Sequence, residues 1–364
     1  MIQVTTLRDG GQTADEIARR VVAFVGAAER SLDLALYDVD LLDAEAKLVA
    51  AALVAAHERG VAVRIAYNLD YAAPIPVPPP PEGVPDLIEQ LPVETKGIAG
   101  EPDLMHHKYV VRDGESVWTG SMNWSADSWT RQENVVAVVH HEYVAANYTR
   151  DFEELWQTEN VAASGDIDPN PIRVDGRKLR TWFCPGRGES LAHRIANRIA
   201  RSRERIRIAS PVLTSAPILG SLAEAAADRK IDIAGVVDGT QMKGVYYQWR
   251  LNGNAAWKMP LLEGIFRNAP FSGKRSTPYG RGDNVHDYMH AKVTITDDTV
   301  FAGSYNLSHS GERNAENVLE IHDADLADRL AAFVDEVRAL YPPAPLPSES
   351  EEGDERKAAA RLIR

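Results

Sequence analysis

Residues 106–123 read HHKYVVRDGESVWTGSMN, and residues 290–306 repeat the pattern as HAKVTITDDTVFAGSYN. Each copy contains His-x-Lys, an Asp after four more residues, and a closing Gly-Ser-x-Asn. A turn at the Asp separates two apolar arms, which predicts a β-hairpin in each copy. The second turn is one residue shorter. Two copies of a set with an imidazole, a cation, a hydroxyl and an amide predict one active site assembled from two halves.

The period of a strand decides which motif side chains share a face. Residues two apart point the same way, so His106 lies with Lys108 and His290 lies with Lys292. His107 points to the opposite face and its counterpart is Ala291, so we interpret His107 as structural.

This set of side chains suits a phosphodiester. Negative charge develops on the equatorial oxygens of the pentacovalent species, and preorganised donors there are usually the largest catalytic term. One neutral imidazole attacks phosphorus, while the other, which is protonated, donates its proton to the leaving oxygen. Spacing alone does not say which histidine attacks. The predicted catalytic residues are His106, Lys108, Asn123, His290, Lys292 and Asn306. The predicted supporting residues of the closing segments are Gly120, Ser121, Gly303 and Ser304.

Two further pairs repeat with the motifs. Glu133 and Glu316 each stand 13 residues after the motif glycine and precede Asn-Val. They are candidates to hold the second ring nitrogen of each histidine and so fix its tautomer. Asp113 and Asp297 are turn residues, which we expect to brace the hairpins by pairing with a base rather than to touch substrate.

The repeat extends over both halves of the chain. Helical patterns at 13–25 and 44–59 alternate with strand patterns at 31–37 and 61–67. The second half repeats this order, with helices at 191–203 and 218–229 and strands at 205–210 and 231–237. Strand, helix, strand indicates parallel pairs with crossover helices, hence an α/β fold. We expect one lobe at residues 1–165, a second at 166–345, and a disordered tail at 346–364.

Two segments break the symmetry. Residues 74–85 hold seven prolines, which predicts an extended surface loop. Residues 241–282 hold seven basic residues, one acid and seven aromatics, without a counterpart of similar length in the first half. The substrate-binding candidates in this insert are Tyr246, Tyr247, Trp249, Arg250, Trp257 and Lys258.

Charge, hydropathy and cysteine content limit the partners, the compartment and the cofactors to be expected. The net charge is −13, whereas proteins that grip long nucleic acid are usually basic, so a polyanion would need a local patch. No apolar run reaches the roughly 18 residues of a transmembrane helix, and no signal peptide is visible. The one cysteine, Cys184, excludes an internal disulfide. We therefore expect a cytoplasmic protein, without a zinc site or cofactor, and monomeric because both half-sites are on one chain.

The paired motifs resemble the HKD motifs of the phospholipase D superfamily. The resemblance runs from about Ala14 to Leu340 and includes Trp182-Phe-Cys-Pro-Gly186, which resembles the opening of the second half in that family. It implies two α/β/α lobes with mixed sheets, related by a pseudo-twofold, with the active site at their interface. It also implies that His106 is the nucleophile, that His290 is the acid and base, and that no metal is usually needed.

Three functions follow as hypotheses. The first is a phospholipase D-type hydrolase that cleaves or exchanges phospholipid headgroups through a phosphohistidine, with the insert 241–282 as a peripheral membrane contact. The alternative is a metal-independent nuclease, in which the insert aromatics stack on the bases of single-stranded DNA or RNA. The third is a non-catalytic phosphate-binding module, which predicts loss of a motif His or Lys, whereas both copies are intact.

Overall fold

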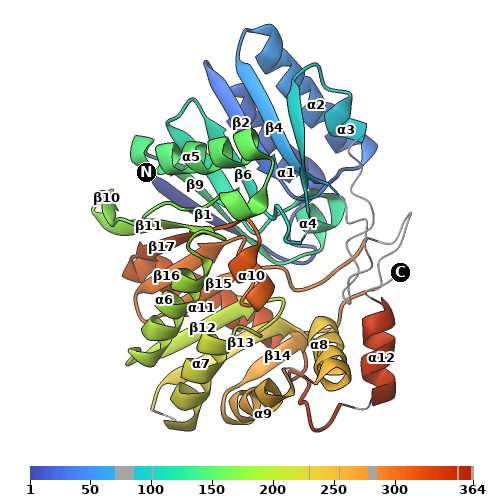
Figure 1. The fold of residues 1–364 in the computed structure, drawn as a ribbon, viewed down its shortest axis with the longest axis vertical. Helices are drawn as coiled ribbons and strands as arrows, with labels where there is room; N and C mark the ends of the chain where they lie inside the picture. Colours follow the sequence, from blue (N-terminus) through green and yellow to red (C-terminus); the bar gives the residue numbers. More distant parts are fainter. Residues whose placement is uncertain are drawn as a thin grey trace.

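The chain builds two mixed sheets, one from each half (Figure 1). The computed structural model describes residues 1–69, 86–100, 102–228, 230–253, 255–277, 285–350 and 352–361. The segment 74–85, expected as a proline-rich loop, lies outside the described residues.

The first sheet has the strand order β1-β9-β7-β6-β2-β4-β5. β2, β4 and β5 run parallel, and the remaining neighbours are antiparallel. Alternate residues of β6 face opposite layers: Val110 packs with helices α1 and α2, and Val111 packs with α5. The strands are β1 (Ile2–Leu7), β2 (Ser31–Leu36), β4 (Ala62–Leu69), β5 (Glu94–Ala99), β6 (Lys108–Arg112), β7 (Ser116–Gly120) and β9 (Asn134–His140); the helices are α1 (Ala14–Gly26), α2 (Asp43–Glu58), α3 (Asp86–Glu89), α4 (Ala126–Thr130) and α5 (Glu142–Thr158). The short strands β3 (Val39–Asp40) and β8 (Trp124–Ser125) form a separate pair.

The second sheet repeats this plan in the order β10-β11-β17-β16-β15-β12-β13-β14. β12, β13 and β14 run parallel, α6 to α9 cover one face, and α11 covers the other. The strands are β10 (Ile172–Val174), β11 (Arg177–Cys184), β12 (Arg205–Ser210), β13 (Asp232–Asp238), β14 (Phe271–Lys274), β15 (Val293–Thr296), β16 (Thr299–Gly303) and β17 (Glu316–His322). The helices are α6 (Gly188–Ala200), α7 (Ala216–Asp228), α8 (Gly239–Asn252), α9 (Met259–Asn268), α10 (His309–Arg313) and α11 (Ala324–Ala339), with a 3₁₀ turn at Ala256–Lys258; another 3₁₀ turn, Val161–Ala163, lies near the end of the first half.

The structure confirms the elements predicted in both halves. Thr13 caps α1 and forms the reciprocal capping box with Glu16. The expected strand at 205–210 is β12, and both motif hairpins form, as β6–β7 and β15–β16.

The two lobes share one apolar core. Helices α5 and α11 lie on the inner faces, and Phe152 and Phe333 belong to the same buried cluster. Met105 and Met289, which precede the two motif histidines, are in that cluster too. The expected two-lobed α/β architecture is therefore confirmed, and we propose residue 165/166 as the division because neither sheet contains a strand from the other half.

The C-terminal tail differs from the expectation. Residues 352–361, expected to be disordered, form helix α12 (Glu352–Arg361), which packs along α8. The buried Glu355 carboxylate binds the guanidinium of Arg250 at 3.1 Å. The mixed charge of the tail therefore indicated disorder wrongly, because the buried Glu355 has a cationic partner about a hundred positions away in the chain. Among the described residues no helix is long and apolar enough to cross a membrane.

Candidate functional site

The two motif histidines lie at the contact between the lobes. His106 lies two residues before β6 and is 5% exposed, and His290 lies three residues before β15 and is 2% exposed. Two short parallel bridges hold these segments across the interface, one between Met105 and Ala315 and one between Glu133 and Met289. Each histidine therefore starts a hairpin in one lobe and lies beside the end of a loop from the other.

Each imidazole is held from the opposite lobe. His106 Nδ1 lies 2.8 Å from Glu316 Oε2, and His290 Nδ1 lies 3.1 Å from Asn134 Oδ1. Both acceptors occupy Nδ1, so in each ring Nε2 is the nitrogen left for chemistry. One contact uses a carboxylate and the other a neutral amide.

The expectation for Glu133 is wrong. Gly120 pairs with Val136 and Gly303 with Val318, so the structural counterpart of Glu316 is Asn134 and not Glu133. The equal spacing of 13 residues misled because the first lobe has one extra residue between its motif glycine and the following strand. Glu133 instead binds Lys274 at 3.1 Å and accepts a hydrogen bond from the Tyr341 hydroxyl at 2.5 Å. Burial raises its pKa and Lys274 opposes that shift.

The two motif lysines are buried beside the histidines. Lys108 Nζ donates to the carbonyl of His106 at 2.6 Å, and Lys292 Nζ donates to the carbonyl of His290 at 2.7 Å. Burial lowers the pKa of Lys108 to about 7, and burial together with the Lys108 charge lowers the pKa of Lys292 well below its usual range. These lowered pKa values mark a site where an anion would stabilise the charged forms.

The same positive charge acts on the imidazoles. Burial, then Lys108 and Lys292, lower the pKa of His106 well below 6.5, and the same causes lower the pKa of His290. Burial raises the pKa of Glu316 to about 8, although both lysines oppose that shift. Because Lys292 acts on His106 and Lys108 acts on His290, the two half-sites form one electrostatic unit.

The closing segments orient the histidine partners. Ser121 donates to Asn134 Oδ1 at 2.7 Å, and Ser304 acts on Glu316 in the equivalent place. A Cβ on Gly120 would lie 2.2 Å from the carbonyl oxygen of Val135, and one on Gly303 would lie 2.0 Å from that of Asn317. Only glycine allows this approach of the hairpin to β9 or β17.

The motif asparagines lie in the same region. Asn123 Nδ2 donates to Asp38 Oδ2 at 3.2 Å. In both Asn123 and Asn306 the amide oxygen is buried and has no hydrogen-bond partner among the described residues. Each amide NH2 group carries two hydrogens, so Asn123 keeps one beside the hydrogen given to Asp38, and both asparagines can donate to a bound ligand.

The motif aspartates brace the fold, as expected, but through backbone amides rather than a basic side chain. Asp113 adopts a positive φ of 58° and accepts from the amides of Glu29, Arg30 and Ser31. Asp297, with a φ of 50°, accepts in the same way from residues 203–205. The amides that bind Asp113 contribute to lowering its pKa. Each aspartate therefore ties its hairpin turn to the start of the neighbouring strand.

The substrate-binding candidates of the insert are mostly structural. Tyr246 is fully buried and Trp249 is 9% exposed, both in the core of the second lobe, and Arg250 binds Glu355. Lys258 donates to the Thr214 carbonyl at 2.8 Å, whereas Trp257 is 56% exposed and Tyr247 is partly exposed. The helical period of α8 (Gly239–Asn252) explains the error, because aromatics spaced three apart belong to its buried face.

Sequence reasoning missed several residues at the site. Asn134 was passed over for Glu133, and only the strand register distinguishes the two. Tyr37 packs its ring edge-on against His106 with centroids 4.6 Å apart, and Tyr288 lies 4.9 Å from His290. Lys108 Nζ lies 4.5 Å from the centroid of the Tyr37 ring. Tyr37 is the last residue of the strand predicted at 31–37, and Tyr288 stands two residues before His290, positions that could have located them.

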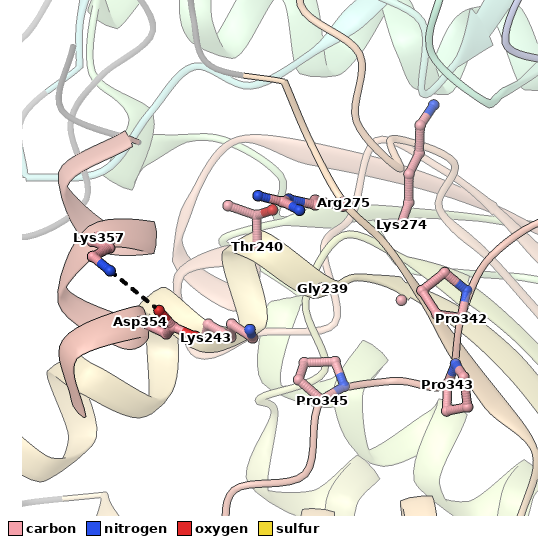
Figure 2. A pocket seen from close by; sticks show the side chains of 11 residues that line it. Gly239, Thr240, Lys243, Lys274, Arg275, Pro342, Pro343, Pro345, Asp354 and Lys357 are labelled. Carbon is pink, nitrogen blue, oxygen red and sulfur yellow. Dashed lines mark ion pairs between the residues drawn. The ribbon is translucent and has the colours of Figure 1, made fainter. Parts of the chain in front are cut away.

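A separate cavity of about 380 Å³ lies between α8, the end of β14, residues 342–345 and α12 (Figure 2). Its lining includes Lys243, Arg275 and Lys357 but none of the motif residues. Lys357 pairs with Asp354 within the cavity wall, at 3.6 Å. Among the described residues no group of three or more His, Cys, Asp or Glu side chains is placed to hold a metal ion.

Two α/β lobes, each presenting a His-x-Lys motif to a common interface, define a phospholipase D-type protein. A sequence model of the family described as cardiolipin synthase, PLD-like domain, matches residues 21–156 and 195–338, which include both motifs. This match takes in more than half of the chain, and the chain belongs to that phospholipase D-like family.

Curated relatives match part of the chain, and solved structures share its fold. The chain is 31% identical over 160 residues to a protein of Xenopus tropicalis named mitochondrial cardiolipin hydrolase, covering 43% of this chain and 68% of the relative. The human protein of that name is 27% identical over 172 residues, covering 45% and 63%. Phosphatidylserine synthase of Haemophilus influenzae has a similar fold, with a TM-score of 0.66 at 13% identity, over 100% of this chain and 95% of that one. Polyphosphate kinase of Porphyromonas gingivalis has a TM-score of 0.59 at 14% identity, over 100% and 56%.

Proposed function

We propose that this chain is a phosphodiesterase of the phospholipase D type, which cleaves phospholipid headgroup esters through a phosphohistidine on His106. One observation carries the proposal. Two buried imidazoles are each held at Nδ1 by a residue of the opposite lobe, and each has a buried lysine beside it. The arrangement combines a nucleophile, a proton donor and fixed cations at one place.

The first step is attack on phosphorus by His106. The Nε2 lone pair of the neutral ring forms the P–N bond while the bond to the leaving oxygen breaks, and His290 gives that oxygen its proton. Lys108 and Lys292 bind the equatorial oxygens, with Asn123 and Asn306 as neutral donors. The negative charge of the substrate raises the lowered pKa of His290, which allows the ring to carry the proton it must give.

The second step regenerates the enzyme. Neutral His290 takes a proton from water, the water oxygen bonds to phosphorus, and the P–N bond to His106 breaks. An alcohol in place of water gives headgroup exchange. Glu316 supports His106 as the nucleophile, because a phosphorylated imidazole with Nδ1–H carries positive charge, which lowers the raised pKa of Glu316 and favours the carboxylate that stabilises the ring. Asn134 gives His290 no such charge.

The substrate class rests on two supports. The family description and the names of the matched relatives concern cardiolipin, an anionic phospholipid. The nuclease alternative relied on an aromatic surface in the insert, and Tyr246 and Trp249 are core residues. We therefore propose cardiolipin-type phospholipids as the first substrates to test, with the protein acting as a monomer at the lipid surface.

The deciding experiment compares two substrates. The protein is incubated in EDTA with vesicles that contain cardiolipin or with labelled single-stranded DNA, beside the His106→Asn variant. Release of phosphatidic acid, absent in the variant, is expected from the vesicles. Cleavage of DNA without any lipid product would overturn the assignment to phospholipids, and full activity in His106→Asn would overturn the phosphohistidine.

A further inference from the structure

The two cross-lobe contacts differ in the residue pair that follows each histidine. Beside the bridge between Met105 and Ala315, His106 meets Glu316, and the next pair is His107 with Asn317. Beside the bridge between Glu133 and Met289, His290 meets Asn134, and the next residues are Ala291 and Val135, both in the apolar core. A buried polar pair therefore stands behind only one of the two histidines.

Asn317 connects the second motif to the first lobe. Its Oδ1 accepts from the hydroxyls of Thr119 at 2.6 Å and Tyr148 at 3.0 Å, and its Nδ2 lies 3.1 Å from His107 Nδ1. Its backbone amide donates to Ser304 Oγ at 3.0 Å, and its carbonyl accepts from the Ser304 amide at 3.0 Å. One buried residue thus fixes the closing segment of the second motif against β7, α5 and the residue before β6.

His107 extends this connection. Its Nε2 lies 2.9 Å from Asp151 Oδ2, within ion-pair distance but without the angle of a hydrogen bond, and the Tyr109 hydroxyl donates to the same oxygen at 2.9 Å. His107, Asp151 and Asn317 are all fully buried. Buried polar networks of this kind hold one geometry, because a displaced member leaves its partners unsatisfied.

We propose that Asn317 and His107 are a positioning pair that fixes Glu316 against His106, and so sets the tautomer and angle of the attacking ring. Neighbouring strand residues point to opposite faces, so Glu316 reaches the active site while Asn317 reaches the network behind it. The carboxylate cannot shift along the ring without breaking the Asn317 contacts. This inference rests on the proposed function, since it assigns His106 the attack on phosphorus.

The test is a double-mutant cycle on Asn317→Val and Glu316→Gln. The valine copies Val135, which occupies the equivalent place in the other contact. With bis(4-nitrophenyl) phosphate as substrate, Asn317→Val should lower kcat by about 10- to 100-fold with KM nearly unchanged, because a small misplacement of a reacting group costs that much. In the Glu316→Gln background the same change should cost less than about threefold, because Asn317 acts through Glu316.

Two further variants separate positioning from stability. His107→Gln keeps an amide that can reach Asn317 or Asp151, and should retain more activity than His107→Ala. Leu222→Ala removes a fully buried side chain of α7 and serves as a control for lost stability, with kcat and pH profile unchanged. If Asn317→Val does not fold, His107→Ala takes its place in the cycle.

The outcomes are distinct. Wild-type kcat and pH profile in Asn317→Val, or an equal loss with and without Glu316, would overturn the positioning role. If His106→Asn keeps full activity, the proposed function itself fails. An inactive His106→Asn beside an unimpaired Asn317→Val overturns the positioning pair alone.

Discussion

The contact of His106 with Glu316 and the contact of His290 with Asn134 occupy equivalent places in two lobes of one fold. Both hold the ring by Nδ1, and both acceptors follow a short parallel bridge between the lobes. They differ in chemistry, since one acceptor is a carboxyl group that can ionise and the other is an amide that stays neutral. The comparison teaches that a duplicated motif can keep its geometry while the opposite lobe gives each copy a different electrostatic setting. The following experiments try to break that distinction.

The largest effect is expected from the histidines. His106→Asn and His290→Asn should each lower kcat on a phospholipid by about 10³-fold or more, since each removes a group used in both steps. Bis(4-nitrophenyl) phosphate separates their roles, because its leaving group needs no proton. His290→Asn should release one equivalent of nitrophenol in a burst and then stall, whereas His106→Asn should give no burst. The reverse pattern would exchange the two roles.

The next largest effect is expected from the residues that hold Nδ1 of each histidine, Glu316 and Asn134. Glu316→Gln should lower kcat by about 10- to 100-fold, because it removes the group that can ionise when the ring becomes positive and so stabilise the phosphorylated ring. Asn134→Asp makes the second contact resemble the first, and should change kcat by less than about tenfold while raising the pKa of His290. The pH profile of kcat measures both. A greater loss from Asn134→Asp than from Glu316→Gln would contradict the assignment of the carboxylate to the nucleophile.

Substrate charge should couple to proton uptake. Burial holds the pKa of Lys108 at about 7 in the free site, and a bound anion raises that pKa again. Anion binding therefore takes up protons, and its affinity should fall as the pH rises through 7. Titration calorimetry with sulfate, whose own charge does not change near pH 7, in buffers of different ionisation enthalpy measures the uptake, with Lys108→Met as the control. Release of protons on anion binding would contradict the predicted proton uptake.

The smallest effect on activity is expected from a substitution in the insert 241–282. Arg250→Ala leaves the buried Glu355 carboxylate without its guanidinium, which should lower the free energy of unfolding by about 1–3 kcal/mol. Because Arg250 packs against α12 and not against the motifs, kcat/KM should stay within about twofold of the wild-type value, as is usual for substitutions away from an active site. Urea unfolding and kinetics on one preparation measure both, with Glu355→Gln as the matched variant. A large loss of kcat/KM at unchanged stability would restore Arg250 as a substrate-binding residue.

Much of the fold could be predicted because its signals are local. The capping box at Thr13, the alternation in β12 and the turns at Asp113 and Asp297 depend on residues close together in the chain. The prediction of substrate-binding residues in the insert failed, because sequence alone does not distinguish an aromatic residue of a core helix from one on a binding surface. Tyr246 is buried only because α8 packs against the second sheet and against Pro345. The Tyr246 hydroxyl donates a hydrogen bond to the Pro345 carbonyl.

The sequence by itself determined the two hairpins, the duplicated lobes and the set of histidines, lysines and asparagines that they present, because spacing along a strand fixes which side chains share a face. Only the tertiary structure decided the partners. Glu316 and Asn317 reach His106 and His107 across 210 positions of sequence, and Asn134 rather than Glu133 reaches His290. These pairings depend on how β9 and β17 register against the opposite lobe, and a shift of one residue turns every side chain to the other face.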